Sequence, residues 1–207
     1  MLAALVPDAI WVQMSTIGVA GIDRVAALAS GESPAVMLLD APVSGSKDPA
    51  ERGELTIFAS GPGEARSRVA LLFDALGQRT IWVGEAGAGT RLKLVNDTWL
   101  AFATEAVATS VALARRLGLE TGTVVDALGG GPLVSTWQAA KLQRIADGEF
   151  SAQFALSLAL KDVHLALQAA GGNRFATLAC LAGEWQQAVE QGLDGQDLTV
   201  VTRALEQ

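Results

Sequence analysis

Two polar residues lie where a short β-rich run passes into a long apolar helix. In residues 84–97 (GEAGAGTRLKLVND), Lys93 and Asn96 are three positions apart and therefore share one face of a helix. The apolar side chains near them in sequence are Leu92, Leu94, Val95, Trp99 and Leu100. These neighbours predict a partly buried lysine that exchanges protons. The alternative is a surface lysine whose aliphatic stem packs along the helix.

A second candidate is the loop of residues 40–46 (DAPVSGS), which follows the apolar run of residues 36–40. If that run is a buried strand, the loop leaves the carboxyl edge of the sheet, where open α/β proteins bind ligands. Ser44 and Gly45 then offer a hydroxyl and backbone N–H groups to a carboxylate. The alternative is an ordinary turn, since such residues are common in turns.

A third candidate is the pair Lys161 and Asp162 on the otherwise apolar segment 154–167. Adjacent charges in such a setting require partners or solvent, because an unpaired buried charge is costly. A solvated helix face explains the pair equally well. His164, alone among Leu and Ala, is expected to be structural.

A serine hydrolase built from Ser44, His164 and an aspartate such as Asp40 is a rival hypothesis. The Gly-x-Ser-x-Gly elbow is absent, because Pro42 and Ser46 occupy the glycine positions.

The elements that must position these residues fall into two parts. Residues 1–85 alternate between strand-like and helical runs, which predicts an α/β layer. The expected strands are 9–14, 36–40, 54–60 and 80–83, with helices at 18–30 and 62–76 and a loop at 41–53. Residues 86–207 show only helical patterning. The expected helices there are 90–117, which would connect the two parts, then 123–128, 135–146, 157–170, 175–191 and 196–206.

Bulk composition narrows the class of protein. Half of the 207 residues are hydrophobic, which is ample for a buried core. The formal charge of -7 argues against a nucleic-acid partner.

Cys180 is the single cysteine, which excludes an intrachain disulfide and a Cys/His zinc site and favours a reducing cytoplasm. Pro7 and Asp8 interrupt the apolar start, unlike a signal peptide, and no run has the length of a membrane span, so we expect a cytoplasmic protein without a membrane partner.

Glycine-rich phosphate loops are not evident. Residues 61–63 (GPG) and 87–89 (GAG) lack the later glycine of Gly-x-Gly-x-x-Gly, and no Walker-type loop occurs.

Taken in order, several segments resemble the β-hydroxyacid dehydrogenase family, which includes 3-hydroxyisobutyrate dehydrogenase and tartronate semialdehyde reductase. The segments are 14–17 (MSTI), 40–45 (DAPVSG), 87–96 (GAGTRLKLVN), 129–137 (GGGPLVSTW), Phe154 and Lys161 with Asp162. The resemblance spans nearly the whole chain. It implies that residues 1–85 form the second half of a Rossmann-type domain and that residues 86–207 form an all-α domain of the 6-phosphogluconate dehydrogenase type.

The resemblance also implies a reaction, namely reversible hydride transfer between a small 3-hydroxy acid and NAD or NADP. Lys93 would be the catalytic acid/base, Asn96 would orient the substrate, and Ser44 with Gly45 would bind the substrate carboxylate.

The cofactor end of the site would involve Thr16 and Lys161, which by resemblance approach the nicotinamide. The chain departs from the family pattern at two positions next to the predicted substrate-binding residues. Ser46, after Gly45, stands where the family often has a second glycine, and Asp97, after Asn96, stands where it often has a second asparagine. The family's Gly-rich first segment has no counterpart before Met14, so we expect weakened cofactor affinity, exposed sheet edges and doubtful activity.

The helical domain implies, again by resemblance, a homodimer or homotetramer. The alternative to an enzyme is a non-catalytic binding or oligomerisation module derived from one.

Overall fold

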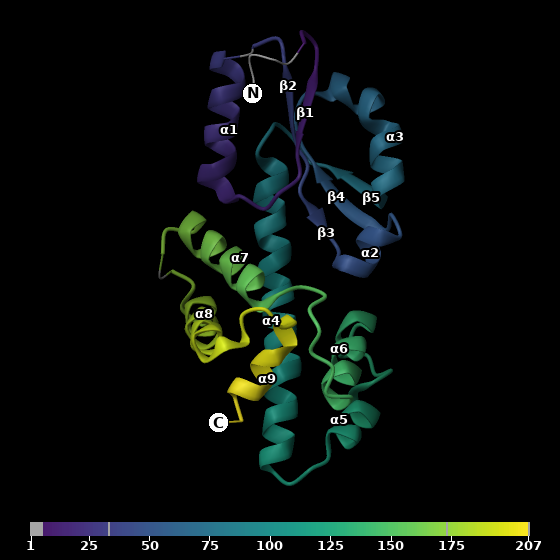
Figure 1. The fold of residues 1–207 in the computed structure, drawn as a ribbon, viewed down its shortest axis with the longest axis vertical. Coiled ribbons are helices and arrows are strands. Elements are labelled where there is room, and N and C mark those ends of the chain that lie inside the picture. The colour runs from purple at the N-terminus through teal and green to yellow at the C-terminus, as the bar shows by residue number, and fades with distance from the viewer. Residues whose placement is uncertain (1–5, 33, 173, 207) are drawn as a thin grey trace. The chain divides into compact units, whose positions relative to one another are not determined.

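The computed structural model describes residues 6–32, 34–172 and 174–206 (Figure 1). Residues 1–5 of the predicted α/β part lie outside the described residues. The chain forms two compact units, the first made of Met1–Asn96 with Gln168–Ala170 and the second of Asp97–Leu167 with Gly171–Gln207.

The first unit is built on two small sheets. Strand β1 (Ile10–Gln13) pairs in parallel with β2 (Met37–Asp40). Strand β4 (Leu55–Ala59) pairs in parallel with β5 (Gly77–Trp82) and antiparallel with the two-residue β3 (Val43–Ser44). A bridge joins the sheets, because the backbones of Asp40 and Ser60 exchange two hydrogen bonds of 3.0 and 2.8 Å.

Two helices cover opposite faces of β1 and β2 (Figure 1). Leu38 packs with Ile22 and Ala29 of α1 (Gly18–Glu32), whereas the next residue, Leu39, packs with Val69 and Phe73 of α3 (Arg66–Leu76). This alternation is the two-residue period of a strand buried on both faces.

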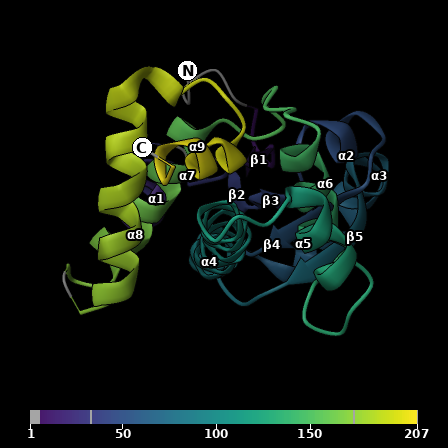
Figure 2. The same cartoon turned by 90° about the horizontal axis from the view of Figure 1, so that it is seen from below.

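The second unit is helical and surrounds most of α4 (Ala88–Arg116), which Figure 2 shows end-on. Helices α5 (Thr121–Leu128) and α6 (Thr136–Ala146) lie on one side of α4, and α8 (Ala176–Ala188) lies on the other. Helix α7 (Leu156–Ala169) and the short α9 (Val201–Ala204) complete the unit. Its core includes fully buried Trp185 and Leu156. None of the helices in the described ranges is long and apolar enough to span a membrane.

The predicted fold class, an α/β part followed by an all-α part, is confirmed, but some element predictions are wrong. The expected loop 41–53 contains β3 and the short helix α2 (Lys47–Glu51). The expected helix 62–76 starts with a 3-10 turn, η2 (Gly63–Ala65).

The expected helix 196–206 is also wrong. It consists of the 3-10 turn η4 (Leu198–Val200) followed by α9, and a π-type turn, η3 (Val189–Leu193), lies just before it. Gly192 adopts φ 81°, which interrupts the helical backbone, and the side chain of Asp197 caps η4 by accepting from the Thr199 amide.

Candidate active site

The loop after β2 and the start of α4 meet in the first unit. The Ser44 hydroxyl donates to Oδ1 of Asn96 at 3.4 Å, although the two residues are 52 positions apart. Both side chains are half-buried. The fold therefore joins two segments that the sequence marked separately as candidates.

Lys93 lies one turn before Asn96 on α4 and is 8% exposed. This burial rules out the interpretation of Lys93 as a surface lysine.

Gly45 occupies a backbone position that a side chain would disturb. Its φ is 138°, and a Cβ added there would lie 2.6 Å from Cδ2 of Leu55. Glycine therefore permits the close turn that follows β3 and leaves the backbone beside Ser44 uncovered by a side chain.

The N-terminus of α4 is held by side chains from the two sheets. Oδ2 of Asp40 accepts from the Thr90 amide at 2.7 Å, and Oδ1 accepts from the Thr90 hydroxyl at 2.8 Å. The Ser60 hydroxyl accepts from the Gly89 amide at 2.9 Å and donates to the Asp40 carbonyl at 3.1 Å. Two amides that a helix start normally leaves unsatisfied are thus satisfied inside the protein.

These contacts bear on the hydrolase hypothesis. The Asp40 carboxylate accepts hydrogen bonds from Thr90, Ser60 and Gly87, and the Ser44 hydroxyl donates to Asn96. Neither arrangement is the Ser-His-Asp relay that a hydrolase requires.

Thr16 lies in the turn between β1 and α1, at the carboxyl end of a parallel strand, and is half-buried. The Gln13 side chain shapes this turn, because it donates to the Ser15 carbonyl at 2.7 Å and accepts from the Ser15 amide at 2.8 Å. The pattern of apolar residues gave no sign of this role for Gln13.

Lys161 belongs to the second unit, on α7. Its ammonium forms an ion pair of 2.7 Å with Oδ1 of Asp162, whose side chain is buried while that of Lys161 is 45% exposed. The ion pair and the partly exposed Lys161 side chain agree with the expectation that these adjacent charges require partners or solvent.

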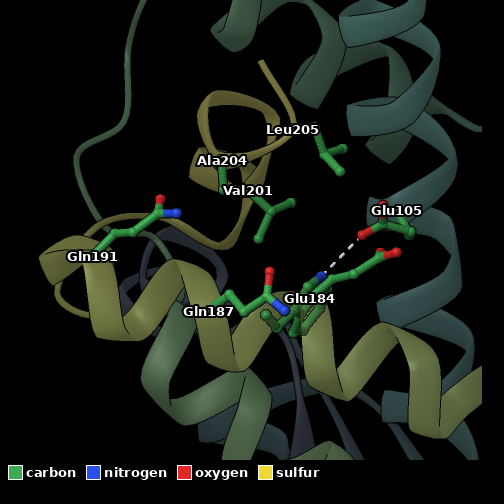
Figure 3. A pocket seen from close by; sticks show the side chains of 8 residues that line it. Glu105, Glu184, Gln187, Gln191, Val201, Ala204 and Leu205 are labelled. Atoms are coloured by element: carbon green, nitrogen blue, oxygen red, sulfur yellow. Dashed lines mark hydrogen bonds between the residues drawn. The ribbon is translucent and has the colours of Figure 1, made fainter. Parts of the chain in front are cut away.

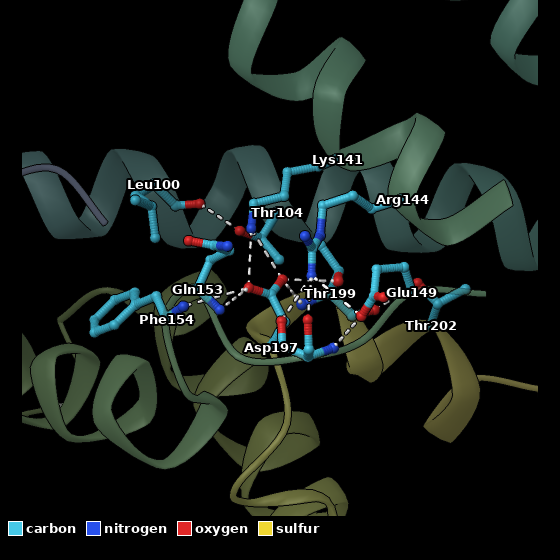
Figure 4. Close-up of polar contacts among 11 residues, drawn as sticks. Leu100, Thr104, Lys141, Arg144, Glu149, Gln153, Phe154, Asp197, Thr199 and Thr202 are labelled. Atoms are coloured by element: carbon cyan, nitrogen blue, oxygen red, sulfur yellow. Dashed lines mark hydrogen bonds and ion pairs between the residues drawn. The ribbon is translucent and has the colours of Figure 1, made fainter. Parts of the chain in front are cut away.

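A second buried carboxylate, Asp197, organises the helical unit (Figure 4). It accepts from the Lys141 ammonium at 2.9 and 3.0 Å, from the Gln153 and Phe154 amides at 3.1 and 3.3 Å, and from the Thr199 hydroxyl at 2.9 Å. Sequence reasoning missed this pair. The available signal was a single lysine on the buried face of the helix 135–146.

The second unit also contains an open hollow (Figure 3), lined by Glu105, Glu184, Trp185, Gln187, Gln191, Val201, Ala204 and Leu205. The Trp185 indole donates to Glu105 at 2.9 Å. Burial, with the nearby Glu105 charge, raises the pKa of Glu184. None of the predicted site residues lines this hollow, so we do not assign the chemistry to it.

Two family models cover almost the whole chain. Residues 87–205 match the model described as NAD-binding of NADP-dependent 3-hydroxyisobutyrate dehydrogenase. Residues 1–84 match the NAD binding domain of 6-phosphogluconate dehydrogenase. The chain belongs to the β-hydroxyacid dehydrogenase family. Within this family, the buried Lys93 and the Ser44–Asn96 contact lie in the segments by which the sequence resembles its members.

Individual β-hydroxyacid dehydrogenases are related at moderate identity. The chain is 28% identical to 2-(hydroxymethyl)glutarate dehydrogenase of Eubacterium barkeri, covering 100% of this chain and 69% of that protein. It is 29% identical to the chloroplastic glyoxylate/succinic semialdehyde reductase 2 of Arabidopsis thaliana, over 82% of this chain but only 48% of that protein. The 3-hydroxyisobutyrate dehydrogenase of Mycobacterium tuberculosis, solved with L-serine, superposes with a TM-score of 0.85 at 27% identity, covering 100% of this chain and 73% of that chain.

Proposed function

We propose that this β-hydroxyacid dehydrogenase chain takes part in the NAD- or NADP-dependent interconversion of a small 3-hydroxy acid and its oxo form. The observation that carries the proposal is the buried Lys93 one helical turn from Asn96, with Asn96 in contact with Ser44. An amine on the same helix face as an amide that contacts a hydroxyl suits a substrate that bears both a hydroxyl and a carboxylate.

In the proposed oxidation, the neutral amine of Lys93 takes the substrate hydroxyl proton while the carbon bearing that hydroxyl loses a hydride. In the reverse reaction, the Lys93 ammonium returns the proton to the developing alkoxide. Ser44 and the Gly45 backbone hold the substrate carboxylate, and Asn96 orients the hydroxyl. Proton transfer and hydride loss then balance in one step.

When bound, a nicotinamide cofactor would supply the hydride acceptor for this chemistry. The turn that contains Thr16 fits its nicotinamide end, because a half-buried hydroxyl lies there between the carboxyl end of β1 and the N-terminus of α1. By the family resemblance, Lys161 of the second unit is a further candidate for cofactor binding, and its side chain is 45% exposed.

Kinetics of a Lys93→Ala variant test the catalytic assignment. With 3-hydroxyisobutyrate and either NAD or NADP, we expect kcat to fall by about 10²-fold to 10⁴-fold, because the general acid/base is removed. Lys47→Ala is the matched control, since Lys47 is a lysine with a 66% exposed side chain on α2. Equal turnover by Lys93→Ala and the parent would refute the role of Lys93. A stable parent with no dinucleotide binding would favour the non-catalytic module instead.

The predicted homodimer or homotetramer through the helical part stays a prediction. Trp99, Phe102 and Leu113 support it, because their spacing places them on one face of α4 and all three are exposed. Light scattering of the intact protein gives the oligomer size directly.

A further inference from the structure

A buried carboxylate outside the assigned site residues connects the two halves of the candidate active site. The side chain of Asp40 binds the first turn of α4, which carries Lys93 and Asn96. Its backbone continues through a short loop to Ser44 and Gly45. One residue therefore contacts both of the segments that must keep a fixed spacing.

The contacts around Asp40 leave little freedom at this helix start. Asp40, Ser60 and Thr90 are at most 1% exposed. Gly89 lies so close to the sheet that an added Cβ would fall 2.2 Å from the Phe58 carbonyl and 2.8 Å from the Asp40 carbonyl. The start of α4 is thus packed directly against the ends of β2 and β4.

The electrostatics favour the same arrangement. A helix N-terminus carries a partial positive charge, so a carboxylate hydrogen-bonded to its N–H groups stabilises it. Thr90 and Lys93 are three positions apart and therefore lie on the same face of α4. Less than one helical turn separates them, so a displacement of Thr90 is expected to displace Lys93 as well.

We propose that Asp40, with Ser60 and Thr90, forms a clamp that positions Lys93 and Asn96 against Ser44, and that these three residues act without touching the substrate. For its effect on catalysis the proposal rests on the proposed function. For its effect on the placement of Lys93 it rests on the contacts alone.

The test compares Thr90→Val with Thr104→Val. Both threonines are buried on α4, but the Thr104 hydroxyl donates within the helix to the Leu100 carbonyl at 2.9 Å. Thr90→Val removes the bond to the Asp40 carboxylate at nearly constant side-chain size, and Thr90→Ser restores it. Asp40→Asn is the second clamp variant, to be used if Thr90→Val does not fold.

The first readout needs no turnover. Acetic anhydride acetylates accessible lysines, and mass spectrometry of peptides gives the rate at Lys93 with exposed Lys47 as the internal reference. We expect Thr90→Val to raise the relative rate at Lys93 by about threefold or more and to speed amide exchange at residues 89–96. Thr104→Val and Thr90→Ser should match the parent. Equal labelling and exchange in Thr90→Val and Thr104→Val would overturn the clamp.

The second readout is kinetic. A misplaced catalytic group lowers kcat, so we expect Thr90→Val to reduce kcat about tenfold while KM changes by less than about threefold. Thr90→Ser should recover the parent value. A loss confined to stability, with kcat unchanged in Thr90→Val, would overturn the positioning role. A parent without turnover would refute the proposed function, and labelling and exchange would then decide the clamp by themselves.

Discussion

Asp40 in the first unit and Asp197 in the second are both fully buried carboxylates that bind the start of a helix carrying a candidate site residue. Asp40 binds the first turn of α4, which carries Lys93. Asp197 binds the amides of Gln153 and Phe154, just before α7, which carries Lys161. In both units, an aspartate side chain therefore accepts hydrogen bonds from backbone amides at or just before the start of a helix, but in different surroundings.

The surroundings differ in charge. Asp197 faces the Lys141 ammonium, whereas the groups that donate to the Asp40 side chain in the described chain, Thr90, Ser60 and Gly87, are neutral. Burial raises the pKa of Asp40, and the neutral hydrogen bonds offset this only in part. Burial acts in the same sense on Asp197, but the Lys141 charge and the bonds from Lys141 and Thr199 outweigh it and lower its pKa. A counterion thus decides which protonation state folding favours.

The largest effect is expected from Asp197→Ala. It leaves the Lys141 ammonium buried without its carboxylate, and breaking a buried pair in this way costs about 3–5 kcal/mol of the free energy of unfolding. Urea denaturation followed by circular dichroism measures the loss. The double variant Lys141→Met with Asp197→Leu should recover only part of it, because it removes both charges but still leaves the donors of Gln153, Phe154 and Thr199 without an acceptor. A loss below about 1 kcal/mol for the single variant would contradict this account.

Asp40→Ala should cost less. It leaves the amide and hydroxyl of Thr90 unsatisfied but no buried cation, which corresponds to about 2–3 kcal/mol. Asp40→Asn should lower the free energy of unfolding by less than Asp40→Ala, because the side-chain oxygen of Asn can still accept from the Thr90 backbone N–H. The same urea titration applies. A cost for Asp40→Ala above that for Asp197→Ala would reverse the comparison.

The pH dependence should have opposite signs at the two sites, and it is the smallest effect. Because the pKa of Asp40 is raised on folding, its stabilising contribution is complete below the ordinary Asp pKa of about 3.9 and is lost as pH rises through the raised value. Because the pKa of Asp197 is lowered, its contribution is complete above about 3.9 and is lost as pH falls through the lowered value.

Urea unfolding between about pH 3 and about pH 7 measures both contributions. The stability difference between the parent and Asp197→Asn should grow with pH. As pH rises, the free energy of unfolding of the parent should fall relative to that of Asp40→Asn. If the stability difference from the parent changed with pH in the same way for both variants, the Lys141 charge would not be the cause of a different pH dependence at the two sites.

The short elements between the candidate segments were the hardest to predict. Strand β3 has two residues and depends on β4, to which Val43 and Ser44 pair, so no local period marks it. Residues 196–206 were expected to be helical from their apolar pattern, but Gly192 interrupts the backbone just before them and the Asp197 cap makes their start a 3-10 turn. In both places a tertiary contact or a single backbone angle overrode the local pattern.

The sequence by itself determined the two-part fold class, the family and the shared helix face of Lys93 and Asn96, because these depend on composition, periodicity and short motifs. Only the tertiary structure decided which polar groups meet. Ser44 and Asn96 are 52 positions apart, Asp40 and Thr90 are 50 apart, and Lys141 and Asp197 are 56 apart. Such contacts follow from the packing of whole helices on sheets and on one another, and no local pattern in the chain records which partner a buried carboxylate will find.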